Sequence, residues 1–338
     1  MTARPTTPSH AAVPAGREPV PGDDAALVDL TRLAGRVTGM RVGRAVRLLA
    51  LDETGGGVRC HKQRAADAAV TAAARDGYGG VVVGSCGNYG WAVARSARAA
   101  GLAAIVVVPA GFAVDTGGMI AAGARVVRAG TTYEDAVAAS RRLTGRGPDP
   151  SPLPTGNGVV TRCGPLADVN VDGPYARAVD GAHRRIVEAI ADSPDDSPDV
   201  LWIPLGNGTT VAAVGGAVLD RGWRCRVVGV SSRCNNSVLA AWPGRCHSPL
   251  DPELLKPTAA NEPLVNCDAL HGQTALDTLH ATGGLAVGVS DAALLDAGRL
   301  LRRAGLRVSP AGAAGVAGLL AAVRNNLRGG THVAVLTG

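Results

Sequence analysis

Short apolar runs alternate with amphipathic helical patterns along most of the chain, and this alternation limits the possible folds more than any other feature. Apolar segments expected to form strands lie at residues 81–83, 104–108, 125–127, 200–203, 226–230, 285–289 and 332–336. Helical periodicity occurs between them, at residues 87–100, 117–122, 132–143, 175–191, 210–219, 292–304 and 313–324. This order predicts an α/β protein with mostly parallel sheets that are flanked by helices.

A cluster of four prolines and four glycines at residues 145–158 divides the chain. Such a run of helix and strand breakers indicates a crossing between domains. We therefore expect an N-terminal domain over residues 36–158 and a C-terminal domain over residues 159–338, each with a mostly parallel sheet. Residues 1–35 are expected to form a flexible tail, because their first part is rich in Pro, Ala and Thr and lacks the apolar core of a signal peptide.

Composition excludes several classes of function. The formal charge is +6, but the basic residues are scattered and carry no zinc-finger or RNA-binding signature, so we expect no nucleic-acid partner. The seven cysteines form no Cys-x-x-Cys pair, which argues against structural zinc and favours a reducing compartment. No apolar stretch approaches the roughly 20 residues of a membrane span. We expect a cytoplasmic protein that binds neither a membrane nor a metal.

Two glycine-rich segments lie where a predicted strand passes into a predicted helix. Residues 204–210 offer successive backbone amides and the positive end of a helix, which suit a phosphate group. They match neither the Walker P-loop nor the dinucleotide-binding fingerprint, and a tight turn without a ligand is the alternative. Residues 84–90 gather four polar or sulfur-bearing side chains where a plain helix cap needs one. This second segment is another candidate anion site.

A third segment, residues 308–318, is rich in small residues. The last predicted strand ends in the short Leu-Thr-Gly segment 336–338. Close packing of small side chains is one explanation for it. The other is a ligand site, because the hydroxyls of Ser309 and Thr337 would lie at strand ends, where open α/β sheets bind their ligands.

Lysine is rare in this chain, with only Lys62 and Lys256 among 34 basic residues. Lys62 follows a glycine-rich turn and opens an apolar helical pattern, whereas Lys256 lies in a proline-flanked loop without glycine. A desolvated lysine amine forms a Schiff base with an aldehyde, which arginine does not. Compositional bias explains the scarcity of lysine but not the position of Lys62.

These segments together resemble the pyridoxal-phosphate enzymes of the tryptophan-synthase-β-like type, known as fold type II, over about residues 50–338. The resemblance implies that Lys62 forms a Schiff base with the aldehyde of pyridoxal 5'-phosphate. It implies that the cofactor phosphate is held by Gly206, Asn207, Gly208, Thr209 and Thr210. It also implies that the substrate carboxylate is held by Ser85, Cys86, Gly87, Asn88 and Tyr89.

Two further roles follow from the same resemblance. Asn88 would bond the phenolic oxygen of the cofactor, and a hydroxyl would contact its pyridine nitrogen. Thr337 is the better match for that hydroxyl, and Ser309 is the second candidate. The family also implies a homodimer and a small amino-acid substrate.

Within the superfamily the chain is most similar to threonine synthases, at residues 170–181, 283–291 and 309–314. It departs from them at Cys60, where serine is usual, and at His61, where Phe or Tyr is usual. Cys86 replaces a hydroxyl that dehydratases and racemases of this fold use in proton transfer, which argues against those two activities.

The resemblance implies elimination or replacement on an amino acid with a leaving group on Cβ or Cγ. Lys62 would take the α-proton and later return it. The threonine-synthase-like hypothesis predicts a phospho- or acyl-activated substrate. One alternative is a β-replacement transferase, similar to cysteine synthase, that makes an unusual amino acid. The other is a diverged homologue that binds the cofactor without turnover.

Overall fold

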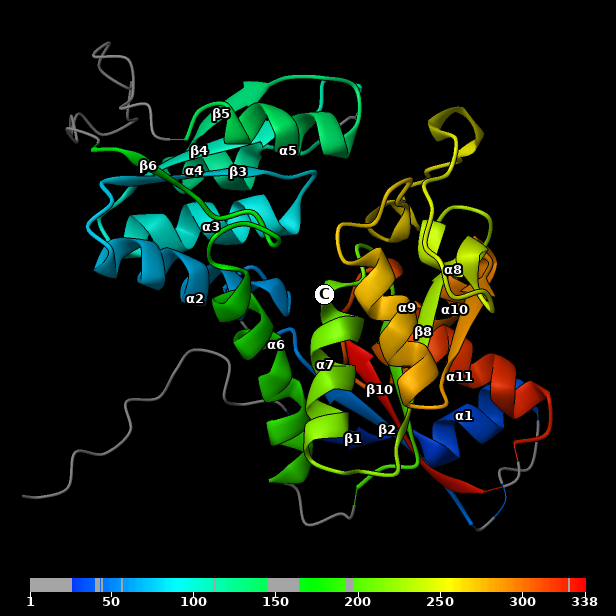
Figure 1. Ribbon diagram of the computed structural model, residues 1–338. Coiled ribbons are helices and arrows are strands. Elements are labelled where there is room, and N and C mark those ends of the chain that lie inside the picture. Colours follow the sequence, from blue (N-terminus) through cyan, green and yellow to red (C-terminus); the bar gives the residue numbers. More distant parts are fainter. Residues whose placement is uncertain are drawn as a thin grey trace, which may run out of the picture.

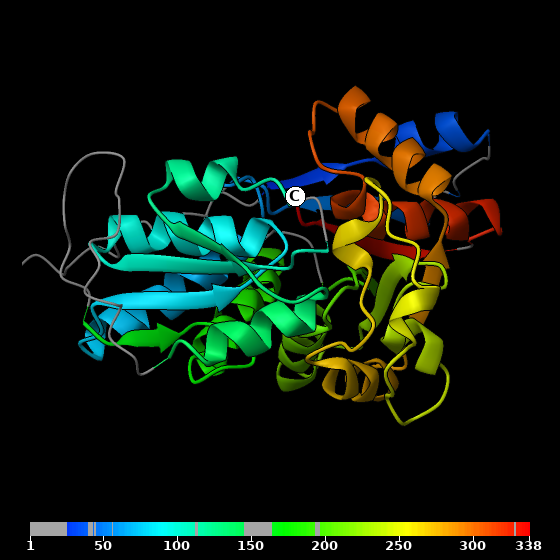
Figure 2. The same ribbon diagram turned by 90° about the horizontal axis from the view of Figure 1, so that it is seen from above.

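The computed structural model describes residues 26–39, 43, 45–55, 57–111, 114–144, 164–192, 197–327 and 329–338. These residues form a six-stranded and a four-stranded sheet, which Figures 1 and 2 show side by side. Every pair of neighbouring strands is parallel except β1 and β2. The prediction of two mostly parallel sheets flanked by helices is therefore confirmed.

The larger sheet has the order β1-β2-β10-β7-β8-β9. Its strands are Ala26–Asp29, Val46–Asp52, Gly330–Leu336, Val200–Pro204, Arg226–Ser232 and Leu285–Val289. Alternate residues of these strands enter two separate cores, so both faces are covered. One core includes α1 (Thr31–Thr38), α10 (Asp291–Arg303) and α11 (Ala314–Arg324). The other includes α6 (Ala176–Ala191), α7 (Thr209–Asp220) and α9 (Gly272–Ala281).

The smaller sheet has the order β5-β4-β3-β6. Its strands are Arg125–Arg128, Ala103–Val108, Gly80–Gly84 and Leu166–Asp168. One face packs on α2 (Lys62–Arg75) and α3 (Asn88–Ala99), and the other on α5 (Tyr133–Arg141). Helix α2 also packs on α6, and α6 on α7, so helices join the two sheets (Figure 1).

Short elements complete the described chain. They are α4 (Gly117–Ala121), α8 (Ser237–Ala241) and the 3-10 turns η1 (Pro252–Leu254), η2 (Glu262–Leu264) and η3 (Ala311–Ala313). Within the described ranges, no helix has the length and apolar character needed to cross a membrane.

The start of the chain differs from the prediction. Strand β1 and helix α1 occupy part of the range assigned to a tail, and β2 joins the larger sheet before the chain enters the smaller one. The larger sheet therefore contains strands that precede the smaller sheet in the sequence, β1 and β2, and strands that follow it, β7 to β10. Residues 1–25 lie outside the described ranges, and so do residues 145–163, which include Cys163 and the whole of the domain crossing expected at 145–158.

Candidate active site

A cavity of about 570 Å³ lies between the two sheets, and both contribute to its walls. From the smaller-sheet side come the residues that begin α2 and α3 and those that precede α5. From the larger-sheet side come residues 206–210, residues 262–267, Thr337 and Gly338. The carboxyl ends of β3, β7 and β10 meet here, which is where parallel sheets place their ligands.

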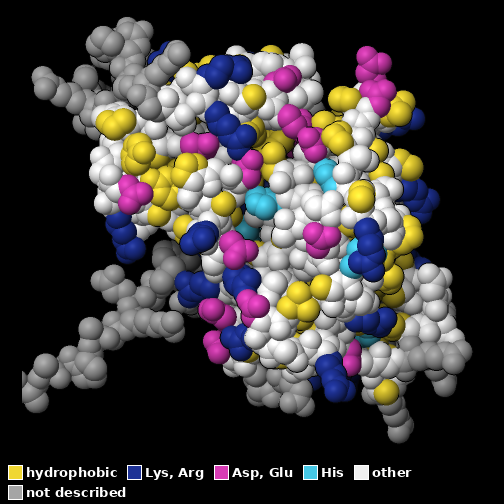
Figure 3. Space-filling view, viewed as in Figure 1, with side chains coloured by type: hydrophobic (Ala, Val, Ile, Leu, Met, Phe, Trp, Pro, Cys, Tyr) yellow, Lys and Arg dark blue, Asp and Glu magenta, His cyan; other side chains and the backbone are white. Residues whose placement is uncertain are grey.

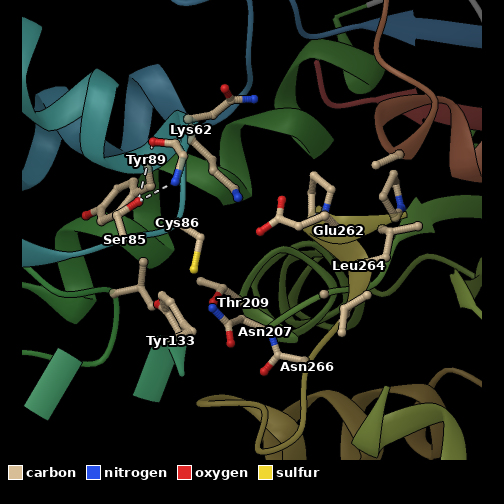
Figure 4. A pocket seen from close by; sticks show the side chains of 18 of the residues that line it. Lys62, Ser85, Cys86, Tyr89, Tyr133, Asn207, Thr209, Glu262, Leu264 and Asn266 are labelled. Carbon is tan, nitrogen blue, oxygen red and sulfur yellow. Dashed lines mark hydrogen bonds between the residues drawn. The ribbon is translucent and has the colours of Figure 1, made fainter. Parts of the chain in front are cut away.

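Lys62 is the first residue of α2, and its half-buried side chain extends into the cavity (Figure 4). Its ammonium group makes no hydrogen bond or ion pair with the described part of the chain, so the nitrogen is open to a ligand. The backbone of Lys256 is held by Asn235, and its side chain is exposed and outside the cavity lining. Of the two lysines, Lys62 therefore lines the cavity and Lys256 does not.

The glycine-rich loop 206–210 connects β7 to α7 along one wall of the cavity. Among described residues, none of its five amides donates a hydrogen bond to the protein, which leaves a row of donors at a helix start. The glycines are needed for space. A Cβ on Gly206 would lie 2.7 Å from the Pro263 carbonyl oxygen, and one on Gly208 would lie 2.7 Å from that of His271.

A second loop with free amides lies across the cavity, at the start of α3. The Ser85 hydroxyl oxygen accepts hydrogen bonds from the amides of Gly87 (3.2 Å) and Gly90 (2.8 Å). Figure 4 marks the hydrogen bonding between Ser85 and Gly87 with dashed lines. The amides of Cys86, Asn88 and Tyr89 make no hydrogen bond with described residues. Ser85 therefore shapes the loop, while the neighbouring amides remain available to an anion.

The side chains of this loop point in different directions. The Tyr89 ring is buried in the core beside the smaller sheet, and its hydroxyl donates to the Val169 carbonyl over 2.9 Å. Only the backbone of Tyr89 is thus placed for a substrate. The Cys86 thiol projects into the cavity (Figure 4). Burial, and then the nearby Glu262, raise its pKa to about 12, so Cys86 remains a neutral thiol at physiological pH.

The two hydroxyl candidates for the pyridine nitrogen have different surroundings. Thr337 follows β10 and lines the cavity, and its hydroxyl has no hydrogen-bond partner among described residues. Ser309 does not line the cavity. Its hydroxyl donates to the Gly338 carbonyl over 2.8 Å and accepts from the Gly312 amide over 3.0 Å. Thr337 is therefore free to contact a ligand, and Ser309 is already occupied.

His61 connects the lysine segment to two distant parts of the larger-sheet half. Its Nδ1 lies 2.9 Å from the Thr337 carbonyl oxygen and its Nε2 lies 3.1 Å from the Thr210 hydroxyl. Burial, and then the neighbouring His183, hold the pKa of His61 well below its usual value. The ring is therefore neutral. Its Nδ1–H donates to the carbonyl, and its Nε2 accepts from the Thr210 hydroxyl.

Tyr133 and Glu262 are among the lining residues that the sequence analysis missed. Tyr133 begins α5, and its phenol lies beside the Asn207 side chain; burial raises the pKa of this phenol. Glu262 begins η2, and Figure 4 shows its carboxylate facing the Lys62 side chain. Burial raises the pKa of Glu262, and the Lys62 charge lowers it by less. Tyr133 lies inside a range predicted as a helix, and Glu262 lies in a range without hydrophobic periodicity. No sequence pattern therefore indicated either of them as a site residue.

No group of three or more potential metal ligands occurs within the described ranges, and the six cysteines described there are free thiols. On the face shown in Figure 3, acidic and basic side chains are interspersed rather than gathered into patches of one sign.

Comparisons with known proteins agree with this architecture. A family model described as pyridoxal-phosphate dependent enzyme matches residues 26–338. A threonine synthase from Synechocystis is 28% identical over 311 residues, which cover 88% of this chain and 72% of that protein. An L-serine ammonia-lyase from Rhizomucor miehei superposes with a TM-score of 0.72 at 20% identity, covering 93% of each chain. A cysteine synthase from Entamoeba histolytica superposes with a TM-score of 0.70 at 15% identity, covering 98% of this chain and 91% of that one.

Proposed function

The chain belongs to the pyridoxal-phosphate-dependent enzymes of fold type II, and from this premise we propose that it replaces an uncharged acyloxy substituent on Cβ of an amino acid. Enzymes of this family use pyridoxal 5'-phosphate. Two features of the cavity support this function: the residues that fit the cofactor, and the charges that surround the place of the substrate.

The cavity residues fit this cofactor. Loop 206–210 offers unpaired amides to a phosphate, and glycine is required at two of its positions. Its Asn207 Oδ1 is buried without a partner among described residues, as expected where a ligand completes the bonding. Lys62 supplies the amine for the aldehyde, and the Thr337 hydroxyl suits the ring nitrogen. When bound, pyridoxal phosphate supplies an electron sink for the bond broken at Cα.

The protein's own groups would then bind the substrate and move its proton. The free amides of Cys86, Asn88 and Tyr89 would hold the substrate carboxylate. This places Cα between them and Lys62, whose amine is positioned to take the α-proton and return it later. The neutral thiol of Cys86 donates a proton far less readily than it would with an ordinary pKa. It would therefore leave proton transfer at Cα to Lys62.

The charge of the cavity wall is the observation that favours β-replacement of an uncharged acyloxy substituent over a phosphorylated one. Lys62 is the only Lys or Arg among the described lining residues, and the walls also carry Glu134 and Glu262. Phosphate groups are normally recognised by Arg or Lys. A phosphorylated side chain would face two carboxylates and no free guanidinium, whereas an acyl-activated serine would bring no second negative charge.

A threonine-synthase-like reaction at Cγ is the second candidate, and the 28% identity to a threonine synthase supports it. That reaction would use a phosphorylated homoserine. It requires the phosphate to be held by backbone amides alone, since the described lining offers no further Lys or Arg.

The test compares leaving-group release from O-acetylserine, O-phosphoserine and O-phosphohomoserine by the holoenzyme. We expect acetate release to exceed phosphate release by at least about tenfold in kcat/KM, and Lys62→Ala to abolish both release and the visible absorption of bound cofactor. Faster phosphate release from O-phosphohomoserine would instead support the Cγ reaction. A coloured wild-type protein that releases neither group would support a cofactor-binding homologue without turnover.

A further inference from the structure

A second cavity of about 670 Å³ adjoins the one that holds Lys62. The two share the start of α3, Gly111 and the start of η2, so they communicate beside Glu262. The second cavity lies between the region around α4 on the smaller-sheet half and residues 257–259 on the larger-sheet half. A molecule that occupies it would meet the substrate at Glu262.

The described walls of this second cavity carry negative charge and an aromatic face. They include the carboxylates of Asp115 and Glu262 and the indole of Trp91, and they include no Lys, Arg or His. The indole is held against the backbone of α4, because a Cβ on Gly118 would lie 2.6 Å from the ring. Carboxylates and an indole face attract an ammonium group and repel an anion.

Glu262 is the carboxylate that lines both cavities. Its side chain makes no hydrogen bond or ion pair with the described residues, although it is partly buried. The Asp115 carboxylate, in contrast, already accepts the Gly117 amide over 2.9 Å. The structure therefore leaves one uncommitted carboxylate at the junction where a second reactant would approach the substrate.

We propose that Glu262 selects an amine as the second reactant and accepts the proton that this amine must lose before it reacts. This inference rests on the β-replacement proposed above. An ammonium ion reaches Glu262 through the second cavity and transfers one proton to the carboxylate. Its nitrogen lone pair then forms the C–N bond to Cβ, from which the leaving group has departed with its bonding electrons. Lys62 returns the α-proton, and the proton on Glu262 passes to solvent.

The neighbourhood of Glu262 suits this role. Its pKa is raised by burial, so the carboxylate is a stronger base than one in water. An anionic nucleophile such as sulfide would have to approach against the same charge. The chemical class of product is thus a 2,3-diamino acid substituted on the distal nitrogen.

The experiment uses the holoenzyme with O-acetylserine and compares methylamine with sulfide. We expect methylamine to give the substituted diamino acid, seen by mass spectrometry, with a higher kcat/KM than sulfide gives cysteine. Glu262→Gln should raise KM for methylamine about tenfold to a hundredfold, the effect of losing a charged hydrogen-bond partner. Any loss of acetate release without a nucleophile should be smaller than the loss of methylamine use, and Glu262→Asp should restore part of the loss in methylamine use.

A matched control is Glu253→Gln, because Glu253 is an exposed residue of η1 outside both cavities and its loss changes the net charge equally. Glu253→Gln should change neither KM for methylamine nor acetate release without a nucleophile. The proposal is overturned if Glu262→Gln lowers acetate release as much as methylamine use, since Glu262 would then serve Lys62. It is also overturned if wild type prefers sulfide.

A binding measurement keeps the test independent of turnover. Saturation-transfer NMR of methylammonium with the holoenzyme should show contact in wild type and in Glu253→Gln, and a strongly reduced signal in Glu262→Gln. Equal signals in all three proteins would contradict the proposal, whichever leaving group the enzyme accepts. Failure to release acetate, with this binding difference intact, would contradict the proposed function alone.

Discussion

At the scale of single residues, the His61 ring joins the lysine segment to the two places where the cofactor should be held. Its neutral form donates to the Thr337 carbonyl and accepts from the Thr210 hydroxyl. Thr210 belongs to the loop expected to bind the phosphate, and Thr337 carries the hydroxyl expected to meet the ring nitrogen. The two hydrogen bonds of the His61 ring therefore hold Thr210 and Thr337 in place relative to Lys62, the next residue in the chain.

Replacing His61 with Leu should weaken cofactor binding because both hydrogen bonds are lost. We expect the dissociation constant of pyridoxal phosphate to rise about threefold to thirtyfold, as the loss of one or two hydrogen bonds would produce. Thr210→Val removes one of these bonds from the other side, so the effects of the two substitutions should be non-additive. Titration monitored by visible absorption checks this, and additive effects of the two changes would show that the bond carries no binding energy.

The residue types alone indicate Lys62 and the two amide loops, because glycine, amide and amine groups at strand ends suggest ligand binding. Glu262 and Tyr133 gave no such signal. Their roles depend on which wall of the cavity they reach, and that depends on contacts between segments far apart in sequence. A lone Glu in an aperiodic loop has no feature that separates it from a solvated side chain.

At the scale of elements, the junction of β2 with α2 contains a buried ion pair. Glu53, which follows β2, lies 2.7 Å from Arg64 of α2, yet both Glu53 oxygens lack a hydrogen bond in the described structure. Burial raises the pKa of Glu53 to about 7 and outweighs the opposing effect of Arg64. The pair therefore connects a strand of the larger sheet to the helix that carries Lys62 at a cost in free energy.

The free energy of unfolding should consequently depend on pH through Glu53. Between its usual pKa of 4.5 and about 7, the unfolded chain releases a proton that the folded chain retains, so stability falls as pH rises. We expect the stability of the apoprotein relative to Glu53→Gln to decrease by on the order of 2 to 3 kcal/mol from pH 4.5 to pH 8. Urea unfolding at several pH values measures this. A constant difference would show that Arg64 neutralises the burial cost.

Most elements were predictable because strands buried on both faces are continuous apolar runs and the helices between them are amphipathic. The exceptions have physical reasons. Strands β1 and β6 contain only four and three residues, one of them an Asp in each strand, so neither shows a continuous apolar run. Strand β2 carries an exposed Arg47 among its buried residues, which interrupts the apolar run. Thr132 caps α5 and Ser290 caps α10 through their side-chain oxygens, which is the local role of Thr and Ser at a helix start.

At the scale of the whole molecule, the reaction site depends on how the two sheets meet. The amides expected to hold the substrate belong to the smaller-sheet half, and those expected to hold the phosphate belong to the larger-sheet half. Sequence order did not reveal this arrangement, since β2 and β10 pair although they are far apart in the chain. The Tyr133 phenol of the smaller-sheet half lies beside Asn207 of the larger-sheet half, so this polar contact spans the two halves.

Tyr133→Phe should therefore affect substrate binding, which needs both halves of the cavity together. Removing the hydroxyl takes this polar contact away from the Asn207 side chain but keeps the ring that packs at the start of α5. We expect KM for the amino-acid substrate to rise about threefold to tenfold, the effect of one neutral polar contact, while cofactor affinity changes less than about twofold. Tyr175→Phe is the matched control, because it removes a 2.8 Å hydrogen bond to Asp76 away from the cavity and should leave KM unchanged. Steady-state kinetics with a parallel cofactor titration separate the possibilities. If cofactor affinity falls while KM stays constant, the hydroxyl acts within the phosphate loop rather than between the halves.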